Sequence, residues 1–76
     1  MKIEILGPGC PKCASLEVRV RQALAESNKS VEVVKITDIN TMIDKGVIQT
    51  PALIIDGKIV SQGKLLSAEQ IKQLIG

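Results

Sequence analysis

The stretch GPGCPKC, residues 7–13, contains both cysteines of the chain and joins two segments with different hydrophobic periodicity. Before it, KIEIL at residues 2–6 is short and mostly apolar, which predicts a β-strand, and the glycines and the proline that follow end it. Pro11 suits the first position of a helix, where its missing N–H is not needed. The stretch therefore predicts a sharp corner from a strand into a helix, with the two cysteines at that corner.

The helix that begins at Pro11 is predicted to bury one face. Its apolar side chains recur at helical spacing, at Cys13, Leu16, Val20, Ala23 and Leu24. Glu17 and Arg21 form a favourable i,i+4 pair on the outer side, and SNKS at 27–30 ends the helix. The β-branched run VEVVKI at 31–36 predicts a second strand, which a right-handed crossover places parallel to the first.

The second half of the chain predicts a short helix and then a β-hairpin. Asp38 can cap the short helix, which carries Ile39, Met42 and Ile43 and ends at Gly46. Asp56-Gly57 between two apolar runs predicts a tight turn joining strands 52–55 and 58–62. Strand 52–55 is apolar on both faces, so we expect it to be central in the sheet.

The last helix is announced by a capping box of Ser67 and Gln70, and its predicted buried stripe is Ile71, Leu74 and Ile75. The order of elements is therefore βαβαββα. We predict a single α/β domain over residues 1–76, with a mixed four-stranded sheet and helices on both faces.

Composition narrows the classes of function. The chain of 76 residues is 45% hydrophobic without any aromatic residue, so its one core is aliphatic. Its net charge is +2 and its basic residues are dispersed, so we expect no nucleic-acid partner. No apolar run approaches the ~20 residues of a membrane span, and the N-terminus does not resemble a signal peptide. We expect a cytoplasmic protein, a setting in which a lone disulfide is more often catalytic than structural.

The two cysteines have three possible uses. A structural disulfide across so short a loop would restrict the unfolded chain by only about 2 kcal/mol. A closed zinc site needs four ligands, and the chain has two cysteines and no histidine. Cu(I) held by the same two thiolates, or zinc shared with other ligands, remains an alternative, as in a soft-metal carrier. The third use is thiol–disulfide exchange.

The residues between the cysteines favour exchange. Cys10 is predicted at the N-cap of the first helix, where unpaired N–H groups and the helix dipole stabilise a thiolate. Lys12 adds a positive charge, so we expect the pKa of Cys10 to lie below the ~8.5 of an ordinary cysteine. Cys13, one turn later on the inward face, should be more buried. Cys10 would then attack a substrate disulfide, and Cys13 would resolve the mixed disulfide.

The chain resembles the thioredoxin-fold superfamily, in particular its small thioredoxin-like and glutaredoxin-like archaeal and bacterial members. The resemblance rests on CPKC at the start of the first helix, Thr50-Pro51 before a buried strand, the Asp-Gly hairpin and Gly63. It implies a protein-disulfide reductase or electron carrier whose only redox centre is the Cys10–Cys13 pair, with no further cofactor. The partners would be protein disulfides and a thioredoxin-type reductase, and we expect a monomer.

The resemblance also implies roles for residues far from the cysteines. Pro51 would be a cis-proline beside the active-site sulfurs, Thr50 would offer backbone hydrogen bonds to an extended substrate, and Gly63 would let that substrate approach closely. The residue before the first cysteine is Gly9, where thioredoxins usually carry Trp. The Gly-Gly-Asp pattern of glutaredoxins is missing from residues 61–66, which disfavours glutathione and leaves a glutathione-dependent glutaredoxin as an alternative. The buried acid of thioredoxins could correspond to Glu4, which we do not count among the site residues.

Overall fold

The computed structural model describes residues 1–9 and 11–76, and within them the elements follow the predicted order. The first half of the chain forms β1 (Lys2–Leu6), α1 (Pro11–Ser27), β2 (Glu32–Ile36) and α2 (Ile39–Asp44). The second half forms β3 (Ala52–Ile55), β4 (Lys58–Gln62) and α3 (Ala68–Ile75). The first, third and fourth strands have the predicted bounds. The second begins one residue later than predicted.

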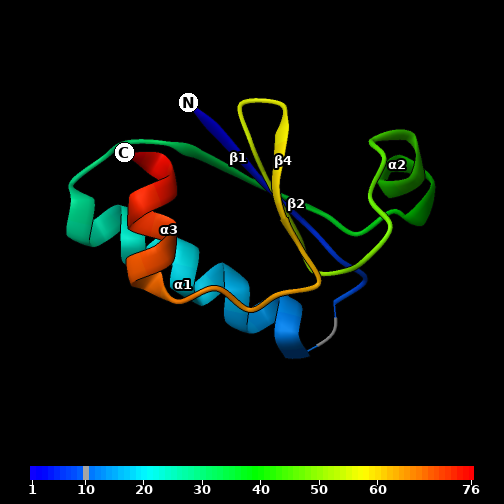
Figure 1. Ribbon diagram of the computed structural model, residues 1–76, viewed down its shortest axis with the longest axis horizontal. Coiled ribbons are helices and arrows are strands. Elements are labelled where there is room, and N and C mark those ends of the chain that lie inside the picture. The colour runs from blue at the N-terminus through cyan, green and yellow to red at the C-terminus, as the bar shows by residue number, and fades with distance from the viewer. Residues whose placement is uncertain (10) are drawn as a thin grey trace.

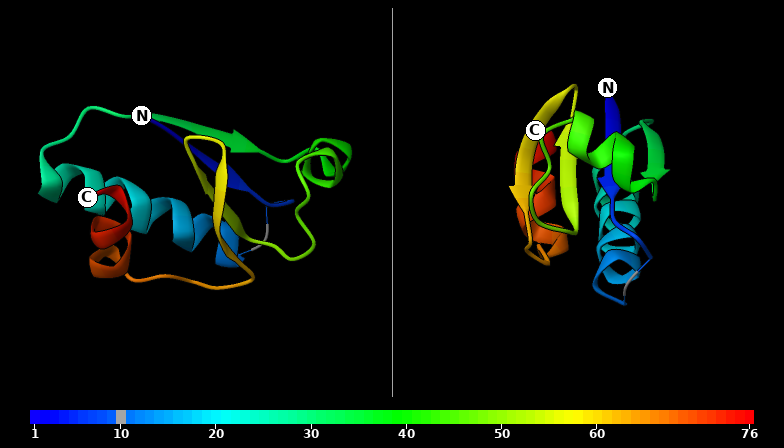
Figure 2. Two further views of the ribbon diagram at one scale, coloured as in Figure 1. Left: turned by 45° about the horizontal axis from the view of Figure 1, so that its top comes forward. Right: turned by 90° about the vertical axis from the view of Figure 1, so that its right-hand side faces the viewer.

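The strands form one mixed sheet in the order β2-β1-β3-β4. β1 pairs with β2 in parallel and with β3 in antiparallel, and β3 pairs with β4 across the hairpin. The interior position of β3 explains why every residue of it is buried. The sheet is seen nearly edge-on in Figure 1, with β4 towards the viewer, and Figure 2 shows the strands side by side.

Helices α1 and α3 pack together against one face of the sheet (Figure 1). The side chains predicted for the buried stripe of α1 are all buried in the structure. They join inward-facing residues of the central strands in the larger core, whose fully buried members include Ile3, Leu16, Val20, Leu53 and Ile71. Burying each such aliphatic side chain contributes roughly 1.5–3 kcal/mol, so this layer supplies most of the stabilisation.

Helix α2 lies on the opposite face, near one end of the sheet (Figure 2). Its Met42, with Val47 in the loop that follows, packs on Leu6, Ala52 and Ile54. The prediction of helices on both faces is therefore confirmed. The two faces are unequal, because a helix of six residues covers only part of the sheet.

Local signals begin and end the elements as predicted. Asp38 caps α2 by accepting a hydrogen bond from the Thr41 N–H at 3.0 Å. Ser67 and Gln70 form the reciprocal capping box of α3. Asp56 and Gly57 have φ of +50° and +84°, the left-handed pair that a two-residue hairpin requires.

The prediction that Leu74 belongs to the buried stripe of α3 is wrong. Its side chain is 43% exposed, whereas Ile71 and Ile75 are buried. Leu74 lies a quarter turn away from Ile75 around the helix, so it falls at the border of the stripe. At this border the sheet ends with β4, and no further described strand covers the side chain.

Candidate functional site

Cys13 lies on the buried face of α1, and its sulfur packs against Gly7 at the end of β1. The residue is only 5% exposed, as the sequence predicts. A Cβ built on Gly7 would overlap the Sγ of Cys13 and would lie 3.9 Å from the Cα of Pro51. The missing side chain of Gly7 therefore lets three segments meet: the end of β1, the first turn of α1 and the start of β3.

Pro51 is the fully buried member of this contact. The peptide bond between Thr50 and Pro51 is cis, the geometry that the family resemblance implies for it. Thr50 itself is exposed. The structure thus places an exposed backbone segment directly before a buried proline and next to the glycine that contacts Cys13.

The loop that leads to Pro51 is held by the end of β4. The Oε1 of Gln62 accepts hydrogen bonds from the backbone N–H groups of Ile48 and Gln49, at 2.8 and 3.2 Å. The N–H of Gly63 donates to the carbonyl of Pro51 at 2.8 Å. These contacts fix residues 48–51 against the edge of the sheet.

Gly63 has a φ of +69°, a conformation that favours glycine. A Cβ on it would overlap the Oε1 of Gln49, whose side chain lies over the glycine. In this structure the space above Gly63 is therefore filled by Gln49. Approach of a substrate to Gly63 stays a prediction, and it requires this side chain to move.

Three of the predicted features depend on Cys10, which lies outside the described residues. Its N-cap position, its lowered pKa and its pairing with Cys13 stay predictions. Lys12 is exposed on the first turn of α1, one residue before Cys13. Its effect on a thiolate stays a prediction as well.

Glu4 is a buried acid on the central strand β1, 8% exposed. It lies between Val34 and Ile54 of the neighbouring strands, on the face that carries α2. Lys2 and Lys45 place their Nζ atoms 3.5 and 3.3 Å from its two oxygens. The carboxylate is thus compensated by two lysines, as a buried charge must be.

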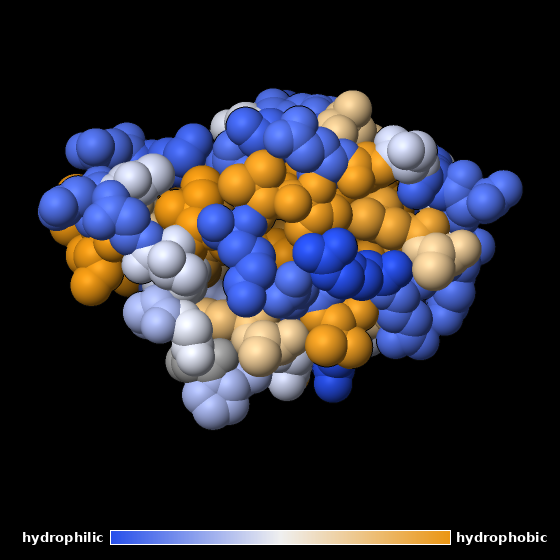
Figure 3. Space-filling view, turned by 180° about the vertical axis from the view of Figure 1, so that it is seen from behind, coloured by the Kyte–Doolittle hydropathy of each residue, from blue (hydrophilic) through white to orange (hydrophobic). Residues whose placement is uncertain are grey.

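An apolar groove of about 230 Å³ adjoins Thr50. Pro8, two residues before Cys10, lies on one side of it, and α2 with the following loop forms the rest. Three aliphatic side chains of this region are well exposed, namely Ile39, Ile43 and Ile48, the last at 85%. From behind, orange surface is visible at the end of the molecule that carries α2 (Figure 3). This surface suits an apolar polypeptide better than a small charged molecule.

Within residues 1–9 and 11–76, no cluster of three or more His, Cys, Asp and Glu is arranged to hold a metal ion. None of the helices in this part of the chain is long and apolar enough to cross a membrane.

Gly7 and Gln62 are the supporting residues that the sequence does not reveal. From the sequence alone, Gly7 is an ordinary glycine at the end of a strand, and Gln62 is the last polar residue of a hairpin. Each acts through a contact with a segment that is distant in the sequence. The only local signal is the position of Gly7 directly between a predicted strand and the segment with the cysteines.

Comparisons with known proteins agree with this arrangement. A family model described as a thioredoxin domain matches residues 1–76. A thioredoxin from Methanothermobacter thermautotrophicus is 35% identical over 75 residues, which are 99% of this chain and 97% of that protein. A thioredoxin from Methanocaldococcus jannaschii is 42% identical over 71 residues, which are 93% of this chain and 81% of that protein.

Proposed function

The chain belongs to the thioredoxin domain family, and from that premise we propose that it reduces protein disulfides through Cys10 and Cys13. A thiol–disulfide oxidoreductase function is what its relatives support. The observation that carries the specific proposal is the contact of the buried Cys13 sulfur with Gly7, beside Pro51. A sulfur that is shielded from solvent thus lies near the exposed Thr50, to which we propose that a substrate binds.

The proposed reaction has two exchange steps. The Cys10 thiolate attacks one sulfur of the substrate disulfide, a bond forms between them, and the other substrate sulfur leaves as a thiolate that takes a proton from water. Cys13 then gives its proton to water and attacks the Cys10 sulfur, so that the bond between Cys10 and the substrate breaks and the second substrate thiolate leaves and takes a proton from water. The substrate has gained an electron pair and two protons, and the protein is left with the Cys10–Cys13 disulfide.

The burial of Cys13 supports its role as the resolving cysteine. Burial limits the access of a substrate disulfide to Cys13, so Cys13 is a poor nucleophile for the first attack. It would react readily with the sulfur of Cys10, three residues earlier in the sequence, because that attack is intramolecular. A buried resolving cysteine therefore releases the substrate without competing for the first attack.

We propose an extended polypeptide as the substrate and a thioredoxin-type reductase as the electron source. The backbone of the exposed Thr50 would pair with an extended polypeptide, and the apolar side chains beside it would bind residues next to the disulfide. The cysteine pair carries the electrons without a further cofactor, and a thioredoxin-type reductase would restore it. We propose that the protein works as a cytoplasmic monomer.

Replacement of each cysteine tests the proposal. We expect Cys10→Ser to abolish dithiol-driven reduction of insulin, and Cys13→Ser to accumulate mixed disulfides that are visible on non-reducing gels. Ala14→Ser on the exposed side of the same turn is the matched control and should keep full activity. Activity retained by Cys10→Ser would refute the proposal. Coupling the assay to glutathione or to a thioredoxin reductase identifies the electron source.

A further inference from the structure

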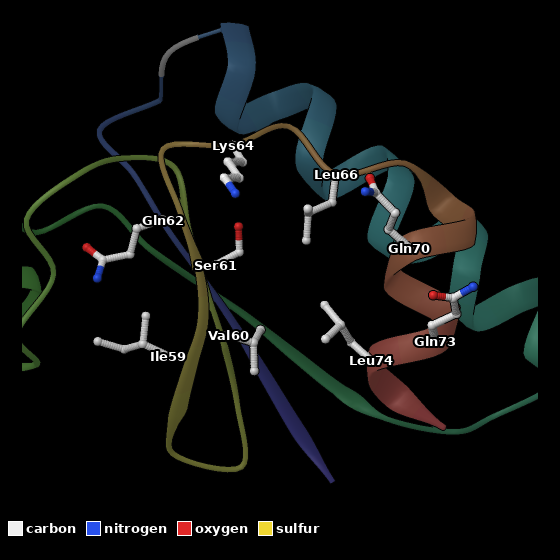
Figure 4. A pocket seen from close by; sticks show the side chains of 9 residues that line it. All are labelled: Ile59, Val60, Ser61, Gln62, Lys64, Leu66, Gln70, Gln73 and Leu74. Carbon is white, nitrogen blue, oxygen red and sulfur yellow. The ribbon is translucent and has the colours of Figure 1, made fainter.

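A second groove lies between β4 and α3, on the side of the molecule that faces the viewer in Figure 1. It has a volume of about 610 Å³, the larger of the two grooves described here. In Figure 4 Val60 of β4 points towards Leu74 of α3, the hydroxyl of Ser61 points up towards Lys64, and Leu66 also lies at the upper end. The exposed Leu74 that departs from the sequence prediction belongs to this groove.

The outer edge of β4 has no strand partner among residues 1–9 and 11–76. Natural edge strands are usually protected by charged residues, by proline or by a strong bulge. β4 has a register shift opposite the bond between Leu53 and Ile54, and a lysine at its first position, Lys58. Its remaining residues, 59–62, are uncharged, so none of their side chains opposes a further strand by its charge.

The side chains around the groove suit a polypeptide. Val60, Leu66 and Leu74 offer apolar surface, while Gln70 and Gln73 offer amides that both donate and accept hydrogen bonds. The Oγ of Ser61 is shielded and has no hydrogen-bond partner within residues 1–9 and 11–76. Lys64 is the charged residue of the lining, and no carboxylate accompanies it there. An acidic side chain is therefore the favoured partner at this end.

The groove and the candidate site share the end of β4. Gln62, which belongs to the lining, holds the backbone of Ile48 and Gln49, and the next residue, Gly63, bonds to Pro51. A polypeptide that leaves Thr50 would pass this end of β4 on its way to the outer edge of the strand. At about 3.3 Å per residue, the five residues of β4 correspond to roughly 16 Å of extended chain.

We propose that this groove binds the extended segment that flanks the disulfide of a protein substrate. The segment adds to the outer edge of β4 as a fifth strand, places alternate apolar side chains over Leu74, and presents an acidic side chain to Lys64. This inference rests on the proposed function, because the occupant is the substrate of that reaction. It adds a preference for extended, partly apolar segments with an acid near the cysteine.

The test uses two probes joined by a disulfide to thionitrobenzoate, whose release is coloured. One is an eight-residue peptide of alternating Val and Thr, with a cysteine at one end and a Glu next to it; the other is N-acetylcysteine amide. Leu74→Ser and Lys64→Glu should each lower kcat/KM for the peptide about three- to fivefold, the effect of roughly 1 kcal/mol, and leave the short probe unchanged. Lys64→Glu should then prefer a peptide with Lys in place of Glu.

Neither matched control alters a residue that lines the groove. Lys58→Glu makes the same charge reversal at the far end of β4, where the peptide carries no charged side chain, and Val18→Ser truncates an exposed side chain on α1. Each control should leave kcat/KM unchanged for the peptide and for the short probe. If these controls lower kcat/KM for the peptide as much as Lys64→Glu and Leu74→Ser do, the proposed docking surface is wrong.

A redox-inert peptide, with Ser in place of its cysteine, separates this inference from the proposed function. Its binding should shift the NMR signals of residues 58–62 and 68–75. If these shifts occur but the wild-type protein reduces neither probe, only the proposed function is refuted. Shifts confined to other residues would overturn the inference. A dimer that Leu74→Ser dissociates, together with absent peptide binding, would show instead that a second copy of the chain occupies the groove.

Discussion

A side chain at Gly7 would occupy the space that the sulfur of Cys13 fills. Gly7→Ala should therefore force a shift of α1 or of β1, and such overpacking typically costs about 1–3 kcal/mol. We expect a loss of that size in the free energy of unfolding under reducing conditions, measured in urea, together with slower disulfide reduction.

The control for Gly7→Ala is a second substitution at Cys13, the residue that Gly7 contacts, because no other glycine offers a matched change. The other glycines have positive φ, where alanine is strained for a different reason. We therefore combine Gly7→Ala with Cys13→Ala, which removes the overlapping sulfur. The cost of Gly7→Ala should fall by about 1 kcal/mol or more in that background. An equal cost in both backgrounds would show that the contact with Cys13 is not the cause.

Glu17 is the residue whose titration should affect stability. Lys35 of β2 and Arg21 of the same helix lie 3.1 and 3.0 Å from its oxygens. The hydrogen bond from Lys35, and then that from Arg21, hold the pKa of Glu17 below its usual value. A lowered pKa in the folded state gives stabilisation that is complete above the unfolded-state pKa and is lost as the pH falls through the folded-state pKa.

Glu17→Gln should therefore lower the free energy of unfolding at pH 7 by up to about 1 kcal/mol and change it little at pH 2. Urea unfolding at the two pH values measures both effects. Glu32→Gln, an exposed change on the strand that carries Lys35, should have a smaller effect at pH 7. A loss of stability for Glu17→Gln that is the same at both pH values would contradict the role of the ion pairs.

At the scale of elements, β4 positions the loop before β3 through one side chain, Gln62. Gln62→Ala removes the acceptor of two backbone N–H groups, those of Ile48 and Gln49. Water can replace it because both groups are exposed, so we expect a cost of only about 0.5–1.5 kcal/mol. The amide hydrogens of both residues should exchange faster. Gln22→Ala on α1 should leave their exchange unchanged, and unchanged exchange in Gln62→Ala would mean that other contacts hold the loop.

The sequence predicts those elements whose ends carry a chemical signal. The bounds of β3 and β4 follow from Pro51 and from Asp56-Gly57, and the start of α3 follows from its capping box. The buried face of α1 follows from its periodicity, since a helix of 17 residues repeats its pattern several times. Leu74 could not be placed in the same way, because α3 has only eight residues and its surroundings depend on where the sheet ends.

The candidate site is predictable only in part for a related reason. The position of Cys13 on the inward face follows from the apolar periodicity of a single helix, α1, and the structure agrees. The contacts of Gly7 with Cys13, and of Gln62 with Ile48, join residues that are distant in the sequence. No local pattern encodes the distance between two elements, so these contacts need the folded structure.

At the scale of the whole molecule, apolar exposure is concentrated at the end that carries α2. Ile48→Ser should weaken the binding of a protein substrate and raise KM for insulin about three- to tenfold, with kcat nearly unchanged. Reduction of a small aromatic disulfide should not change. Val18→Ser, which alters a side chain with 64% exposure on α1, is the control and should leave KM for insulin unchanged. Equal effects of both changes would show that general surface hydrophobicity is responsible.

The packing of Cys13 between β1, α1 and β3 also links redox chemistry to folding by a thermodynamic cycle. The surroundings of this sulfur exist only when strands from both halves of the chain are in place. If the protein cycles as proposed, the difference in unfolding free energy between its reduced and oxidised forms equals the shift that folding imposes on the reduction potential of the unfolded chain. At about 30 mV per 1.4 kcal/mol, two urea titrations then report this shift without any redox partner.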